Sequence, residues 1–81
     1  MRYVFGRGFP EKLESLPKQV QRKFWKQLAF LLADIRHPSL RAKKYDEALG
    51  IWQARADRSH RFYFYIEKDA YVLLDIRMHP K

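Results

Sequence analysis

From Ile51 to His79 the sequence alternates apolar with polar residues, and the period changes at Ile51 from helical to strand-like. Short polar stretches at residues 57–59 and 67–69 interrupt the alternation and are typical of turns. Strands joined by such short connections pair as an antiparallel meander, because a parallel crossover needs about a dozen residues or more. The pattern therefore predicts three consecutive strands that pair side by side.

Residue parity predicts two chemically different faces of this meander. One face is apolar and carries Trp52, Ala54, Ala56, Phe62, Phe64, Ile66, Val72, Leu74, Ile76 and Met78. The other face carries Arg55, Arg61, Tyr63, Tyr65, Leu73, Asp75, Arg77 and His79. We expect the first face to be buried and the second, which is cationic, to remain open.

The N-terminal half predicts one short strand and two helices. Residues 2–5 suit a strand, and Pro10 can open a short helix because its missing N–H costs nothing in a first turn. A longer helix is predicted from Pro17 to about Ile35. Its apolar stripe consists of Val20, Phe24, Leu28, Leu31, Leu32 and Ile35. Phe30 lies outside this stripe, so it either packs on the first helix or meets a partner.

Pro38 disfavours helical geometry at His37 and ends the long helix near Arg36. A polar, basic connector is predicted from there to Gly50. Together the elements predict an α+β fold in the order β-α-α-β-β-β, with two N-terminal helices packed on one face of a mainly antiparallel four-stranded sheet.

Composition limits the chain to one small folded unit. The 81 residues support one modest core, so we expect a single domain over residues 1–81. The hydrophobic fraction of 47% is too high for a disordered chain. There is no cysteine and no long apolar run, so we expect no disulfide, signal peptide or membrane span, and a cytoplasmic location. A net charge of +8 favours a nucleic-acid partner, although an ordinary basic surface has the same composition.

The cationic face has residues suited to bind and cleave RNA. Arginine binds phosphate bidentately, and Tyr63 and Tyr65 offer rings on which bases stack. RNA supplies its own 2′-hydroxyl nucleophile, so cleavage needs a base, positive charge at the phosphate and an acid, but no metal and no cofactor. Arg61 is the candidate for the phosphate and His79 for the acid.

Other cations fit supporting roles on this face. Arg55 and Arg77 position the RNA backbone or add positive charge, and Arg41, Lys43 and Lys44 of the connector line a phosphate path. Each has an alternative interpretation. Arg55 or Arg77 pairs with Asp75, the connector is a solvated loop, and His79 is an incidental surface residue.

Four short motifs resemble the RelE/ParE superfamily of toxins in order and spacing. They are His37-Pro38-Ser39-Leu40, Gly50-Ile51-Trp52 followed by Arg55, His60-Arg61, and the closing Arg77-Met78-His79. The resemblance spans essentially the whole chain. The spacing from Trp52 to His60-Arg61 and the late Arg-X-His look most like the YoeB branch of ribosome-dependent mRNA endoribonucleases.

The resemblance implies a toxin of a type II toxin–antitoxin pair that enters the A site of the 70S ribosome, cuts mRNA there and is restrained by a cognate acidic antitoxin. It implies that Arg61 is the phosphate-contacting arginine, His79 the catalytic histidine and Arg77 the late arginine of related members. Two positions depart from the YoeB pattern. Ala42 replaces the glutamate, which leaves Asp46, Glu47 or the Lys43-Lys44 pair as the base, and Pro80 replaces the terminal tyrosine.

Two other functions remain open for a chain of this kind. A ParE-like toxin blocks DNA gyrase without cutting RNA, and a catalytically silent member only binds its antitoxin. ParE relatives generally lack the late histidine, so His79 favours the ribonuclease.

Overall fold

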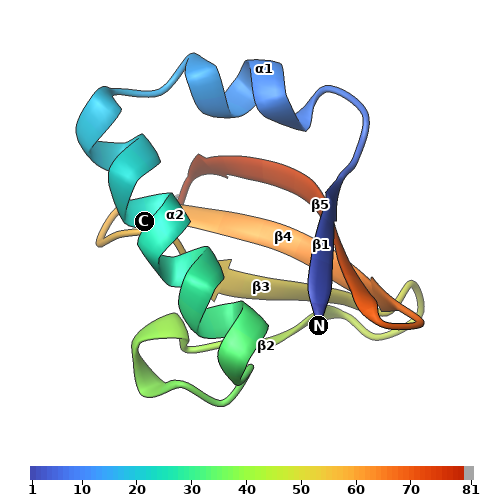
Figure 1. The fold of residues 1–81 in the computed structure, drawn as a ribbon. Helices are drawn as coiled ribbons and strands as arrows, with labels where there is room; N and C mark the ends of the chain where they lie inside the picture. Colours follow the sequence, from blue (N-terminus) through green and yellow to red (C-terminus); the bar gives the residue numbers. More distant parts are fainter. Residues whose placement is uncertain (80–81) are drawn as a thin grey trace.

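Two helices cover one face of a five-stranded sheet in the computed structural model, which describes residues 1–79 (Figure 1). The helices are α1 (Phe9–Glu14) and α2 (Lys18–Ala33), and η1 (Pro38–Leu40) is a short 3-10 helix. The strands are β1 (Arg2–Phe5), β2 (Lys43–Asp46), β3 (Ile51–Arg55), β4 (His60–Glu67) and β5 (Ala70–Met78). They lie in the order β1-β5-β4-β3-β2, and only the β1–β5 pair is parallel. The predicted α+β class and the meander from β3 to β5 are confirmed.

The prediction of four strands is wrong, because β2 forms a fifth at the edge of the sheet. It lies within the segment predicted as a connector, where Lys43 pairs with Gln53 and Lys44 with Trp52. The sequence Lys-Lys-Tyr-Asp contains no apolar alternation, since an edge strand with exposed side chains needs none. Charged residues on such an edge also discourage pairing with other chains.

The predicted parity of β5 is wrong in its first half because of a β-bulge. Tyr63 pairs with Asp75 but the next residue, Phe64, pairs with Leu73, which leaves Leu74 as the extra residue. The bulge reverses the faces on its N-terminal side. Leu73 is therefore fully buried, whereas Val72 and Leu74, both predicted to face inward, are only partly buried.

Of the other positions predicted to face inward, those in the middle of β4 and β5 are buried and those near the strand ends are exposed. Phe62, Phe64 and Ile76 are fully buried, as predicted. Ile66 and Met78 are 43% and 66% exposed, so their predicted burial is wrong. Both are among the last two residues of their strands.

The core forms where the apolar stripe of α2 meets the sheet. Phe24 packs edge-to-face on Phe62, with the two ring centroids 5.2 Å apart. The predicted stripe is confirmed at Val20, Phe24, Leu28 and Leu31, which are all buried. Phe30 stacks on the ring of His37, beside η1. None of the helices within residues 1–79 is long and apolar enough to cross a membrane.

The bulge predicts different effects of two neighbouring substitutions. Leu73→Ala should lower the free energy of unfolding by about 2–5 kcal/mol, because it removes a fully buried side chain from the core. Leu74→Ala should lower it by about 1 kcal/mol or less, because that side chain is already partly in solvent. Urea denaturation of both variants measures the difference. Equal losses, or a larger loss for Leu74→Ala, would contradict the bulged register.

Candidate nucleic-acid interface

Three arginines lie side by side on the open face of the sheet. Arg55 is paired with Arg61 across β3 and β4, and Arg61 is paired with Arg77 across β4 and β5. Like charges directly opposite one another destabilise a sheet. Burial, followed by the charge of Arg55, lowers the pKa of Arg61 from its ordinary value. This row is unfavourable for the isolated protein and well suited to a bound polyanion.

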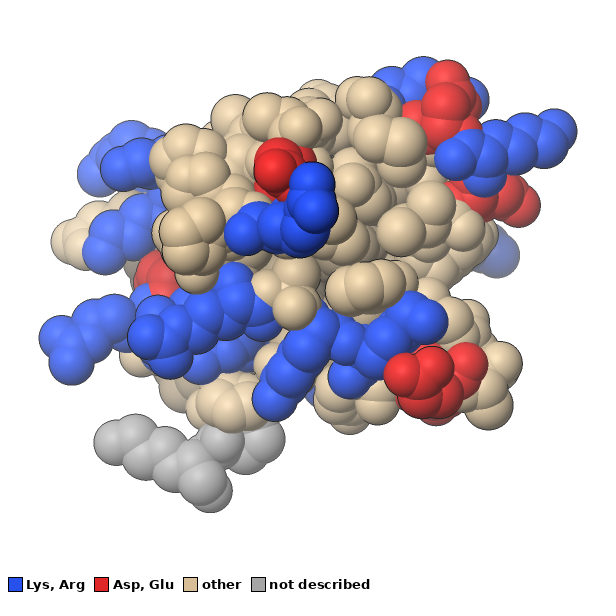
Figure 2. Space-filling model, turned by 90° about the horizontal axis from the view of Figure 1, so that it is seen from below, with Lys and Arg blue, Asp and Glu red and all other residues tan. Residues whose placement is uncertain are grey.

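A concavity of about 300 Å³ lies over part of this row. Its lining residues are Arg41, Lys43, Gln53, Arg55, Arg61 and His79. The lining contains no carboxylate among the residues that the structure describes. A band of Lys and Arg side chains also crosses the lower half of the molecule in Figure 2, seen from the side on which β2 lies in Figure 1. The concavity can therefore take a negatively charged group such as a phosphate.

The turn between β3 and β4 holds the guanidinium of Arg61. Nη1 of Arg61 donates hydrogen bonds to the carbonyl oxygens of Asp57 and His60, at 3.1 and 3.0 Å. A longer hydrogen bond of 3.4 Å reaches the carbonyl of Arg58. These three acceptors fix one side of the guanidinium before any ligand binds, which reduces the entropy lost on binding.

Asp57 in turn determines the shape of this turn. Its Oδ1 accepts hydrogen bonds from the backbone N–H groups of Ser59 and His60, at 2.9 and 2.8 Å, and lies 3.0 Å from Nδ1 of His60. Burial alone would raise the pKa of Asp57, but these hydrogen bonds outweigh it and lower the pKa below its ordinary value. The pair formed by the buried His60 and the partly buried Asp57 therefore supports the loop that holds Arg61.

The same turn also positions His79. The backbone N–H of His79 donates a hydrogen bond of 2.6 Å to the carbonyl of Ser59, while its side chain is exposed and lines the concavity. The structure thus brings together Arg61 and His79, the predicted phosphate ligand and the predicted acid. Pro80, the other position singled out near this end, lies outside the described residues.

Arg77 contacts two tyrosines on this face of the sheet. Its Cζ is 4.8 Å from the centroid of the Tyr63 ring, and its Nη2 donates a hydrogen bond of 3.3 Å to Oη of Tyr45. Tyr63 is only 5% exposed, so in this arrangement its ring supports Arg77 and offers no free face to a base. Nε of Arg77 also lies 3.9 Å from Oδ2 of Asp75, so the ion pair considered as the alternative role of Arg77 is present.

Tyr45 is a part of this face that the sequence pattern does not reveal, whereas Gln53, which alternation places on the same face as Arg55, lines the concavity. Tyr45 is 55% exposed and packs edge-to-face on Tyr63, with centroids 4.9 Å apart. It occupies the bulge of β2, a strand that lacks a readable pattern. Tyr65, predicted to bind RNA, lies in a separate concavity with Arg2 and Val4, away from Arg61.

The candidate bases are not all in one place. Lys43 lines the concavity, whereas Nζ of Lys44 lies 5.2 Å from the ring of Trp52, which packs against the core on the opposite side of the sheet. Glu47 pairs with Lys44 at 3.6 Å. Asp46 caps the following turn by accepting a hydrogen bond of 3.0 Å from the N–H of Leu49. Of the four candidates, only Lys43 lies with Arg61 and His79.

No protein-family model and no curated protein matches this chain. Solved structures do. A YoeB/ParE toxin from Agrobacterium tumefaciens superposes with a TM-score of 0.81 at 14% identity, over 99% of this chain and 100% of that one. A chain of the RelE–RelB complex from Pyrococcus horikoshii superposes with a TM-score of 0.78 at 17% identity, over 95% of this chain and 92% of that one. A chain of the YoeB–YefM complex from Staphylococcus aureus superposes with a TM-score of 0.68 at 19% identity, over 99% of this chain and 98% of that one.

The protein therefore has the fold of the RelE and YoeB/ParE toxins. The resemblance found in the sequence motifs is confirmed at the level of the fold.

The turn around Asp57 predicts a pH-dependent stability. Asp57→Asn should lower the free energy of unfolding by about 1–2 kcal/mol at pH 7, because charge-assisted hydrogen bonds are replaced by neutral ones. The pKa of Asp57 is lower in the folded protein, so this contribution is complete above the unfolded value of about 4 and is lost as the pH falls through the folded value. Urea denaturation between pH 7 and pH 2 measures it.

The control for this prediction is Glu14→Gln, which removes an exposed carboxyl from α1. We expect the Asp57→Asn deficit to shrink toward zero at low pH and the control to show no such change. A deficit that is independent of pH would show that the charge of Asp57 does not stabilise the turn.

Proposed function

We propose that this protein is the toxin of a type II toxin–antitoxin system and a ribosome-dependent endoribonuclease that cleaves mRNA in the A site. The observation that carries the proposal is the row Arg55, Arg61 and Arg77, with His79 beside it at a concavity without carboxylates in its described lining. The fold shared with RelE and YoeB/ParE toxins supports the same class.

Cleavage in this site uses the 2′-hydroxyl of the RNA as the nucleophile and needs no metal. The 2′-oxygen bonds to the adjacent phosphorus as the P–O5′ bond breaks, which leaves a 2′,3′-cyclic phosphate and a 5′-hydroxyl. Arg61, held by the turn carbonyls, stabilises the charge that develops on the phosphate oxygens. His79 donates the proton that the departing 5′-oxygen takes up. Lys43, the candidate base that lines the concavity, accepts the proton of the 2′-hydroxyl.

A partner that masks this face accounts for how a cell tolerates such an activity. Solved structures with this fold include a RelE–RelB complex and the YoeB–YefM toxin–antitoxin complex. We infer that a cognate acidic antitoxin binds the protein, since a chain of net charge +8 attracts an acidic partner. Its targets when released are mRNA and the 70S ribosome, in the cytoplasm.

Substitution of either of the two central side chains should slow cleavage strongly. His79→Ala removes the acid and should lower the rate by about 100-fold or more. Arg61→Ala removes the charge at the phosphate and should lower it by about 100- to 1,000-fold. Growth arrest after induction and primer extension on mRNA measure both effects.

Met78→Ala and Arg7→Ala are matched controls, because both side chains are exposed and neither lines the concavity. They should arrest growth and cut mRNA as the parent does. Unimpaired cleavage by His79→Ala and Arg61→Ala would refute the mechanism. Inhibition of DNA supercoiling by gyrase without mRNA cleavage would favour a ParE-like toxin, and normal growth on unrestrained expression would favour a catalytically silent member.

A further inference from the structure

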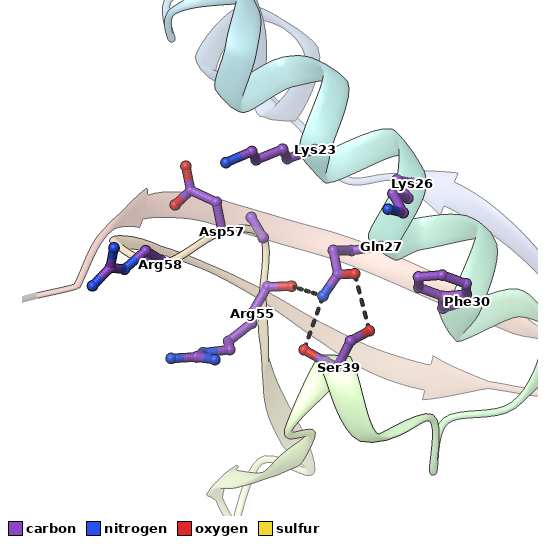
Figure 3. A pocket seen from close by; sticks show the side chains of 9 residues that line it. Lys23, Lys26, Gln27, Phe30, Ser39, Arg55, Asp57 and Arg58 are labelled. Atoms are coloured by element: carbon purple, nitrogen blue, oxygen red, sulfur yellow. Dashed lines mark hydrogen bonds between the residues drawn. The ribbon is translucent and has the colours of Figure 1, made fainter.

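A second concavity, of about 280 Å³, lies between α2, η1 and the turn after β3 (Figure 3). It shares one residue with the concavity described above, because Arg55 lines both. Nε of Arg55 is buried and has no hydrogen-bond partner within residues 1–79. Arg55 therefore connects the two concavities.

Cations from two elements border this second concavity. Lys23 and Lys26 extend from α2 on one side, and Arg58 comes from the β3–β4 turn on the other (Figure 3). None of these three forms an ion pair with any residue that the structure describes. Asp57 also lines the space, but its Oδ1 accepts hydrogen bonds from Ser59 and His60 within the turn. The net charge presented to a ligand is positive.

The wall of the concavity is fixed and contains an aromatic ring. Nε2 of Gln27 donates hydrogen bonds of 3.0 Å to the carbonyls of Ser39 and Arg55, and Oγ of Ser39 donates one of 3.1 Å to Oε1 of Gln27 (Figure 3). Phe30 also lines the space and is stacked on His37 with centroids 3.8 Å apart. An aromatic ring near unpaired cations matches the two parts of a nucleotide, a base and a phosphate.

We propose that this concavity is a nucleotide subsite for the RNA strand whose scissile phosphate lies at Arg61. Lys23, Lys26 and Arg58 bind a phosphate, and Phe30 contacts the base. This inference rests on the proposed function and extends it by a stretch of RNA that passes over Arg55. The combination of ring and cations, continuous with the first concavity, favours RNA over an acidic peptide, which would need no aromatic contact.

Binding of uncleavable RNA tests the subsite. The probes are a 2′-O-methyl RNA hexamer and a 2′-O-methyl dinucleotide, the second too short to occupy both concavities. The double variant Lys23→Gln with Lys26→Gln should weaken hexamer binding about tenfold and flatten the slope of log K against log salt by up to about 0.7, since the two lysines contact one phosphate and each neutralised phosphate on a single strand contributes roughly 0.7. Phe30→Leu, which keeps an apolar side chain, should weaken hexamer binding about fivefold.

The double variant Arg2→Gln with Arg7→Gln is the control, because it removes the same charge from residues that line neither concavity. It should leave the salt slope unchanged, and thermal melting verifies that every variant is folded. The ratio of hexamer to dinucleotide affinity should fall only for the subsite variants. The subsite would be overturned if the control pair lost as much hexamer affinity as the Lys23 and Lys26 variant. It would also be overturned if that variant lost equal affinity for both probes. A third contradicting result is that the variant binds a polyglutamate peptide more weakly while its hexamer binding is unchanged.

Arg61→Gln separates this inference from the proposed function. If Arg61→Gln weakens both probes and the Lys23 and Lys26 variant weakens neither, only the subsite is wrong. If the parent protein binds neither probe, the subsite is wrong, whereas the proposed function is decided separately by cleavage of mRNA on the ribosome.

Discussion

The contact between Phe24 of α2 and Phe62 of β4 joins the two layers on which the rest of the structure depends. Both rings are fully buried and pack edge-to-face at 5.2 Å, an arrangement that adds to the free energy of burying them. Because this side of the sheet supplies the core, the other side can hold charged residues that add nothing to the core. Three arginines in register are tolerated there, although their mutual repulsion disfavours the folded state.

The turn between β3 and β4 connects the core to the proposed site residues Arg61 and His79. Asp57 pairs with the buried His60, and the carbonyls of the turn that they shape hold Arg61 and the backbone of His79. The proposed phosphate ligand and the proposed acid therefore depend on one local structure. Such a site is preorganised, because its cationic group is oriented before RNA arrives.

The sequence pattern predicted the features that depend on local periodicity, and missed those that depend on pairing. Alternation predicted that Arg61 and His79 share a face, because parity survives wherever a strand is regular. It could not predict the bulge at Leu74, which is defined only by the partner strand, or β2, whose exposed edge has no apolar pattern. Because β2 was not predicted, the contacts of its Tyr45 with Tyr63 and Arg77 were not predicted either.

The central claim is that a 2′-hydroxyl attacks a phosphate held at Arg61. The direct measurement uses purified 70S ribosomes programmed with two mRNAs, one all-ribose and one with a single 2′-deoxy nucleotide on the 5′ side of the scissile bond. The account predicts that the protein cuts the ribose message in the A site to leave a 2′,3′-cyclic phosphate, and leaves the deoxy-substituted message intact at that bond. Equal cleavage of both messages, or cleavage of neither, would contradict it.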